Sequence, residues 1–154
     1  IWVYEDKVDR EDFGNMHTVP YYDTLTEKAI QRLENGENIL LLPKPDKIGE
    51  SEWKKLLESG ASINLDSVAD FRPISMFVPN FFNNHKCSNL FEAKVLQGKV
   101  LVCSLNFDSE KCKKIEVRYL KQAMLEYFTS ADFEPNQRLE VEELQGFFRT
   151  EASK

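Results

Sequence analysis

Apolar residues recur at the three-to-four-residue spacing of an amphipathic helix in three parts of the chain. The first part has a Thr24–Glu27 capping box at its start and Gly36 as a stop signal. The second begins at Ile115, and its apolar positions form one wide face that continues to Phe128. The pattern therefore predicts helices near residues 24–35, 115–128 and 141–148, the last docking Leu144, Phe147 and Phe148.

Short apolar runs bounded by glycine or proline predict strands between these helices. Ile39–Leu42 is continuously apolar and is followed by Pro43, which is typical of a strand buried on both faces. Helix, tight turn and buried strand in this order favour a parallel α/β layer. Further strands are predicted at Ile1–Tyr4, at Ile74–Val78 as a core strand, and in a hairpin of Leu90–Leu96 and Val100–Phe107 that turns at Gln97-Gly98.

Length and charge limit the classes of protein to which this chain can belong. At 154 residues, with 42% hydrophobic and 30% charged residues, the chain suits one globular domain. The formal net charge of −6 and the lack of a basic stripe argue against nucleic acid as a partner, because binding phosphates draws on Lys and Arg. No apolar run reaches the roughly 20 residues of a membrane-spanning helix. The chain starts at Ile1 without a signal peptide, which we interpret as a single domain (1–154) excised from a larger multidomain protein.

The residue types that carry catalysis do not occur in a catalytic arrangement. The cysteines (Cys87, Cys103 and Cys112) lack disulfide or metal-ligand spacing, so we expect buried thiols. Cys87 lies two residues from His85, but no nucleophile elbow accompanies them. We expect Glu92, within a predicted strand, to point outward or pair with a lysine rather than serve as a glycosidase carboxylate. The sequence predicts no catalytic residue, no metal site and no cofactor.

One loop has a composition that suits carbohydrate. Aromatic rings stack on sugar faces and amides bind hydroxyl groups, and both residue types occur between positions 80 and 85. The alternative is that the phenylalanines dock on the core or on a neighbouring domain. The candidate carbohydrate-binding residues are Phe81, Phe82, Asn83, Asn84 and His85.

Five strings stand out along nearly the whole chain: IWVY at 1–4, ENILLLP at 37–43, NHKCSNLFEAKV at 84–95, GKVLVCS at 98–104 and RYLKQAMLEY at 118–127. In this order they resemble the C-terminal region of family 2 glycoside hydrolases, the β-galactosidase-like enzymes of polysaccharide-degrading bacteria. The string at 84–95 is the most specific, since it resembles that family's NHKLGLLFEAKV. One departure is that Pro43 and Arg72 are only 29 positions apart, where the family has a longer stretch. Either this protein has a true deletion between Pro43 and Arg72, or residues are missing from the sequence around Ile48–Ser51.

The resemblance implies an α/β domain of flavodoxin-like fold, related to class I glutamine amidotransferases: a three-layer sandwich with a mostly parallel sheet and a C-terminal hairpin. It also implies a non-catalytic accessory domain whose parent glycosidase is periplasmic, secreted or at the cell surface. Partners would be other domains of the same parent chain, a second copy in a homo-oligomer, or carbohydrate. We expect a packing role, with a carbohydrate-binding module as the alternative and an autonomous amidase or esterase as a remote one. The contact residues expected for packing are Trp2, Tyr4, Phe147 and Phe148.

Overall fold

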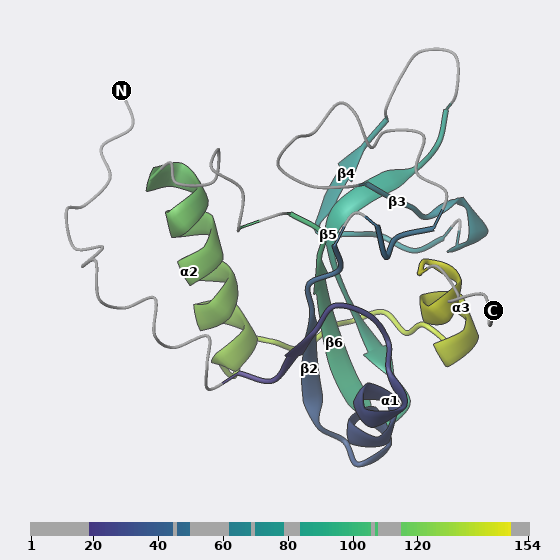
Figure 1. Ribbon diagram of the computed structural model, residues 1–154, viewed down its shortest axis with the longest axis vertical. Coiled ribbons are helices and arrows are strands. Elements are labelled where there is room, and N and C mark those ends of the chain that lie inside the picture. Colours follow the sequence, from purple (N-terminus) through teal and green to yellow (C-terminus); the bar gives the residue numbers. More distant parts are fainter. Residues whose placement is uncertain are drawn as a thin grey trace.

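A computed structural model describes residues 19–44, 46–49, 62–68, 70–78, 84–105, 107 and 115–148. At its centre is a six-stranded sheet with helices on both faces (Figure 1). The strands are β1 (Tyr21–Tyr22), β2 (Asn38–Leu41), β3 (Ile63–Asn64), β4 (Ser75–Phe77), β5 (Cys87–Val95) and β6 (Gly98–Cys103). The helices are α1 (Glu27–Glu34), α2 (Ile115–Thr129) and α3 (Val141–Gly146).

The sheet is mixed, with strand order β1-β2-β6-β5-β3 and with β4 also paired to β5. Strands β1, β2 and β6 run parallel, whereas β5 runs antiparallel to β6, β3 and β4. The expected flavodoxin-like, mostly parallel sandwich is therefore wrong. The antiparallel hairpin of β5 and β6 was expected, but β3 and β4 also pair antiparallel with β5, so three of the five pairs between described strands are antiparallel. A parallel pair needs a long crossover, which α1 supplies between β1 and β2.

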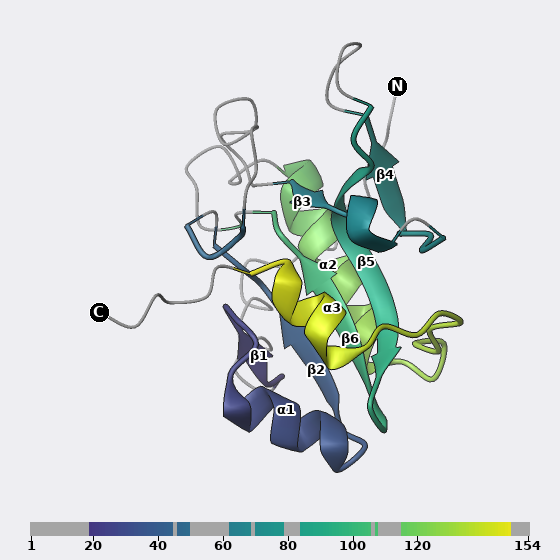
Figure 2. The same cartoon turned by 90° about the vertical axis from the view of Figure 1, so that its right-hand side faces the viewer.

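Alternate residues along the strands pack against different helices, as the two-residue period of a strand requires. On one face, Ile39 of β2 and Phe91 of β5 belong to the core that includes residues of α1 and α3. Figure 2 shows this face, with α1 and α3 towards the viewer. On the other face, Leu40 and Leu101 pack with Met124 of α2. The sheet thus separates two apolar clusters, and α2 alone among the described helices covers the second.

The predicted hairpin is present, but its glycine has a different role. The turn residues are Leu96 and Gln97, and Leu96 takes the positive φ, 54°, that we expected of glycine. Gly98 is instead the first residue of β6. A Cβ at Gly98 would lie far inside van der Waals contact with the Glu37 carbonyl oxygen and 3.1 Å from the Leu33 Cα. Glycine is needed there because the turn after α1 approaches the strand closely.

The first helix is capped differently from the prediction. Thr26, not Thr24, is the N-cap, and its side-chain oxygen accepts a hydrogen bond from the Ala29 backbone N–H at 3.2 Å. Gly36 follows the helix with a φ of 81°, which confirms the predicted stop. The helix therefore spans two turns and holds its buried side chains over the first face of the sheet.

The segment predicted as a core strand at Ile74–Val78 forms the edge strand β4 instead. Ile74, Met76 and Val78 are 51%, 63% and 57% exposed. The prediction of burial is wrong because β4 pairs only with β5 among the described strands. Apolar composition alone does not decide whether another layer covers a strand.

Candidate docking surface

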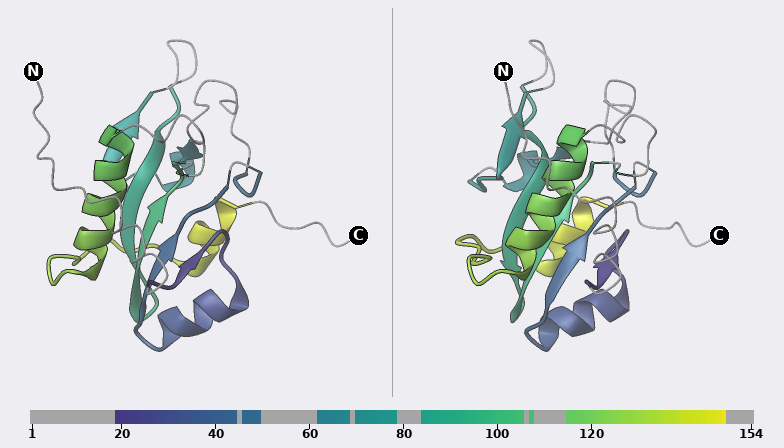
Figure 3. Two further views of the ribbon diagram at one scale, coloured as in Figure 1. Left: turned by 60° about the vertical axis from the view of Figure 1, so that its left-hand side comes forward. Right: turned by 90° about the vertical axis from the view of Figure 1, so that its left-hand side faces the viewer.

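A groove of about 330 Å³ opens between α2 and the part of the sheet next to β4. Figure 3 shows α2 lying along this face of the sheet. The walls are almost wholly apolar. Helix α2 contributes residues spaced by four and three positions, which share one helix face. The lining residues are Ile74, Leu90, Leu101, Leu120, Met124 and Tyr127.

Exposed apolar side chains also occur around β4, where Ile74, which lines the groove, is followed by Met76 and Val78. The register of β4 against β5 shifts between Ser75 and Phe77, so simple alternation does not place these three side chains on one side. Leu120, on the helix side of the groove, is 41% exposed. An apolar groove with further exposed apolar side chains in the same part of the chain is a candidate interaction site. We call the groove and these four residues the α2–β4 surface.

The outer edge of β4 has no partner among the described strands. Leu90 of β5 pairs with Cys103 of β6 and also with Ser75 of β4, so β4 and β6 lie on opposite sides of β5. Among the described strands, none pairs with the side of β4 that faces away from β5. An open edge offers backbone N–H and C=O groups to another strand. The α2–β4 surface therefore combines apolar side chains with backbone groups that can pair.

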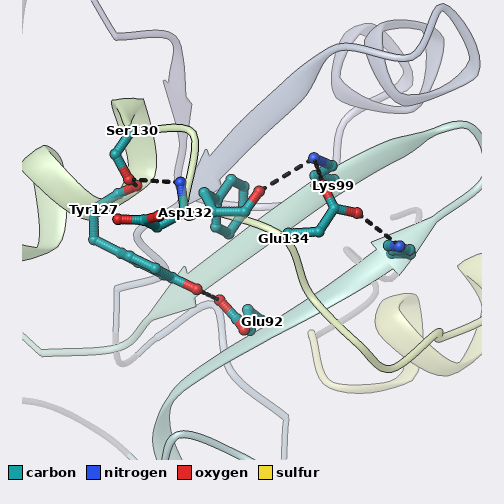
Figure 4. A network of polar contacts seen from close by, with 8 residues as sticks. Glu92, Lys99, Tyr127, Ser130, Asp132 and Glu134 are labelled. Carbon is teal, nitrogen blue, oxygen red and sulfur yellow. Dashed lines mark hydrogen bonds and ion pairs between the residues drawn. The ribbon is translucent and has the colours of Figure 1, made fainter.

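One polar contact borders the groove. The Tyr127 hydroxyl donates a hydrogen bond to the Glu92 carboxylate at 2.6 Å (Figure 4). Burial, and then this bond, raise the pKa of Tyr127 to about 12, so the hydroxyl stays protonated and remains a donor at neutral pH. Glu92 is half-buried, and the partner of its carboxylate is a tyrosine rather than the lysine that the sequence suggested as one alternative. The Tyr127 hydroxyl thus gives the Glu92 carboxylate a hydrogen-bond partner next to the apolar lining of the groove.

A charged cluster lies further along the same strands. Glu134 accepts hydrogen bonds from Lys94, at 2.7 Å, and from Lys99 (Figure 4). Lys99 also donates to the Phe133 carbonyl at 3.1 Å. The bonds from Lys94 and then Lys99 lower the pKa of the Glu134 carboxyl to about 2. This end of the face is therefore polar, and the apolar surface is confined to the β4 end.

The loop predicted to bind carbohydrate is described only in its last two positions. Phe81, Phe82 and Asn83 lie outside the described residues. Asn84 is exposed, and the His85 Nδ1 lies 2.6 Å from an Asp66 carboxylate oxygen. A backbone bond from Lys86 and then the His85 contact lower the pKa of Asp66. Asp66 thus fixes the end of the loop, and carbohydrate binding there stays a prediction.

The cysteines are poorly suited to nucleophilic chemistry. Cys87 and Cys103 are both buried free thiols, as predicted, and Cys112 lies outside the described residues. Burial raises the pKa of Cys103 to about 11, and burial and then the charge of Asp66 raise that of Cys87. A raised pKa lowers the fraction of reactive thiolate. Within the described part of the chain, no group of three His, Cys, Asp or Glu residues could hold a metal ion.

Two of the expected contact residues belong to the core instead. Phe147 and Phe148 are 5% and 7% exposed, and the Phe147 ring packs edge-on against Phe91 with centroids 5.8 Å apart. They dock with Leu144 as the sequence pattern predicts, so they offer no surface to a partner. Trp2 and Tyr4 lie outside the described residues.

The sequence carried no signal for the exposure of the β4 segment. Ser75 is the one polar residue in the run Ile74–Val78 and Phe77 is apolar, so the run does not alternate and its pattern does not separate an exposed face from a buried one. The groove itself had no signal either. Leu120 and Ile74 are 46 positions apart and meet only because α2 packs over β5 and β6.

Fold and surface together define a mixed α/β domain with helices on both faces of its sheet and an open apolar surface at one sheet edge. The chain belongs to a family described as a domain of unknown function (DUF8487), which matches residues 46–149. Strand β2 precedes the matched region, yet its buried side chains complete both apolar clusters, so it is part of the same domain. No curated protein matches the chain. None of the described helices is both long and apolar enough to cross a membrane.

Proposed function

We propose that this chain is a non-catalytic packing domain that buries its α2–β4 surface against another part of its own polypeptide. The observation that carries this proposal is the apolar groove beside a strand edge that has no partner among the described strands. Covering such a surface removes apolar area from water at roughly 25 cal/mol per Å². It also pairs backbone groups that are otherwise left to solvent.

The contacts around the groove favour packing over chemistry. The one polar pair at its wall, Tyr127 and Glu92, satisfies both partners, and a neutral hydroxyl bound to a carboxylate supplies neither a nucleophile nor a free acid. Packing is the role expected for an accessory domain of a family 2 glycoside hydrolase. The glycosidase parent, its action on glycans and its export rest on the five sequence strings alone.

Met76 gives a direct test, because the thioether of an exposed methionine is oxidised to the sulfoxide and a covered one is protected. Met76 is 63% exposed in the described structure, and Met124, in the groove floor, is 5% exposed. We expect Met76 in the native polypeptide to react with dilute hydrogen peroxide at least several-fold more slowly than in a peptide of residues 70–80, as followed by mass spectrometry. Met124 serves as the protected internal reference. Equal rates for Met76 in the protein and the peptide would refute the packing role.

A further inference from the structure

A carboxylate stands on the same face of the sheet as the apolar groove. Glu92 of β5 lies directly opposite Leu101 of β6, and Leu90 precedes it by two positions. Both leucines line the groove. The pairing of β5 with β6 continues without a register shift through these residues, so alternation places all three side chains on the α2 face. A segment that covers the groove therefore comes close to Glu92.

The hydrogen bond from Tyr127 gives Glu92 a partner but does not neutralise its charge. Among the described residues, the hydrogen-bond partner of Glu92 is the Tyr127 hydroxyl, at 2.6 Å, and the Glu92 side chain is half-buried. A carboxylate has about four acceptor positions, so water can still solvate the others. A covering segment removes this water. Burying a charge without a counterion is costly, whereas a cationic donor offsets the lost solvation.

The lysines on the same two strands bind a different carboxylate. Lys94 follows Glu92 by two positions on β5, and Lys99 lies opposite Lys94 on β6. Both lysines donate to Glu134, Lys94 at 2.7 Å (Figure 4). Their charges are therefore already matched by Glu134, and a cation for Glu92 has to come from the covering segment.

The helix side of the groove is acidic as well. Glu116 is exposed and precedes Leu120 by four positions, so it lies on the same side of α2 one turn away. Lys121 follows Leu120 in the sequence, but its Nζ lies over the Phe107 ring, 5.8 Å from the centroid. The charges around the groove thus favour a cationic group and disfavour an anionic one.

We propose that the segment that covers the α2–β4 surface places an apolar side chain in the groove and a lysine or arginine against Glu92. This inference rests on the proposed packing function and states the chemistry of the covering segment. The apolar side chain is stabilised by leaving water. The cation donates to the carboxylate of Glu92 while Tyr127 keeps its own bond to the same group.

The test measures how well the groove is covered in the native polypeptide. Leu120→Cys places a thiol at a groove position whose side chain is 41% exposed in the described structure. Its reaction with iodoacetamide is followed by mass spectrometry of the fragment that contains position 120. We expect this reaction to be at least several-fold slower in the native polypeptide than in a peptide of residues 115–129 with the same substitution.

Glu92→Gln in this background removes the charge and keeps an acceptor for the Tyr127 hydroxyl. We expect it to make the labelling at position 120 several-fold faster, because the cation of the covering segment loses its counterion. Glu126→Gln is the matched control, since Glu126 accepts a hydrogen bond from Gln122 at 2.8 Å on the opposite side of α2. It should leave the labelling rate unchanged. Circular dichroism shows whether each variant keeps the fold.

Salt separates an ion pair from a structural role of Glu92. Raising NaCl from about 0.1 M to about 1 M shortens the Debye length from about 10 Å to about 3 Å. We therefore expect salt to speed the labelling at position 120 when Glu92 is present and to have little effect in Glu92→Gln. A side chain that only supports the local structure would give no such difference.

The outcomes distinguish this inference from the packing function. Slow labelling at position 120 that neither Glu92→Gln nor salt changes would overturn the cationic contact and leave the packing function in place. Faster labelling in Glu92→Gln without a salt response in the presence of Glu92 would also overturn it. Labelling as fast in the native polypeptide as in the peptide would remove both proposals together.

Discussion

Gly98→Ala tests whether the junction between α1, the following turn and β6 is as tight as the structure shows. A methyl group at this position would overlap the Glu37 carbonyl oxygen and lie 3.0 Å from the Leu33 Cδ2 and 3.1 Å from the Leu33 Cα. Two of these three atoms belong to the backbone, so a side-chain rotation cannot relieve the overlap. The turn after α1 would have to move away from the strand.

The size of the expected loss in unfolding free energy depends on whether backbone or side-chain atoms must move. Adding a methylene-sized group to a well-packed site costs about 1–3 kcal/mol, and more when the backbone shifts. We therefore expect Gly98→Ala to lower the free energy of unfolding by about 3 kcal/mol. For a chain of this size, that loss lowers Tm by roughly 6–12 °C.

Urea unfolding followed by circular dichroism measures this loss, provided that the slope of free energy against urea stays unchanged. Gly146→Ala is the matched control, because a Cβ there meets nothing within 4 Å. Gly146 is the last residue of α3, and replacing it should stabilise the fold by about 0.4–1 kcal/mol through the unfolded chain. A Gly98→Ala variant within 0.5 kcal/mol of the parent protein would refute the close approach described here.

The remaining predictions concern the two polar contacts on the α2 face. Tyr127→Phe removes the bond to Glu92 and should cost about 1 kcal/mol in the same urea assay. Because the folded pKa of Tyr127 is raised from 10.0 to about 12, the parent protein loses stability as the pH rises through this range, and the variant should lose less. Glu134→Gln removes a carboxyl whose folded pKa is lowered from 4.5 to about 2, so its stabilisation is complete above pH 4.5 and is lost as the pH falls towards 2. The parent's acid-side slope should therefore flatten in this variant, and an unchanged slope in thermal melts from pH 5 to 2 would contradict the ion-pair geometry.

The sequence by itself determined the positions of the described helices and of the long strands. The start of α2 at Ile115, the buried β2 and the β5–β6 hairpin all follow from local periodicity and from stop signals such as Gly36. These features depend on residues a few positions apart. They can therefore be predicted without knowing what packs against them.

Only the tertiary structure decided strand direction, the partners of polar side chains and the exposure of the sheet edge. Tyr127 and Glu92 are 35 positions apart, and Gly98 is constrained by Glu37 across the fold. The run at Ile74–Val78 is largely apolar whether or not another layer covers it. Its sequence therefore predicts a strand but does not predict that its side chains are exposed to solvent. Alternation fixes which residues share a face, whereas the neighbour of each face is chosen by the packing of the whole chain.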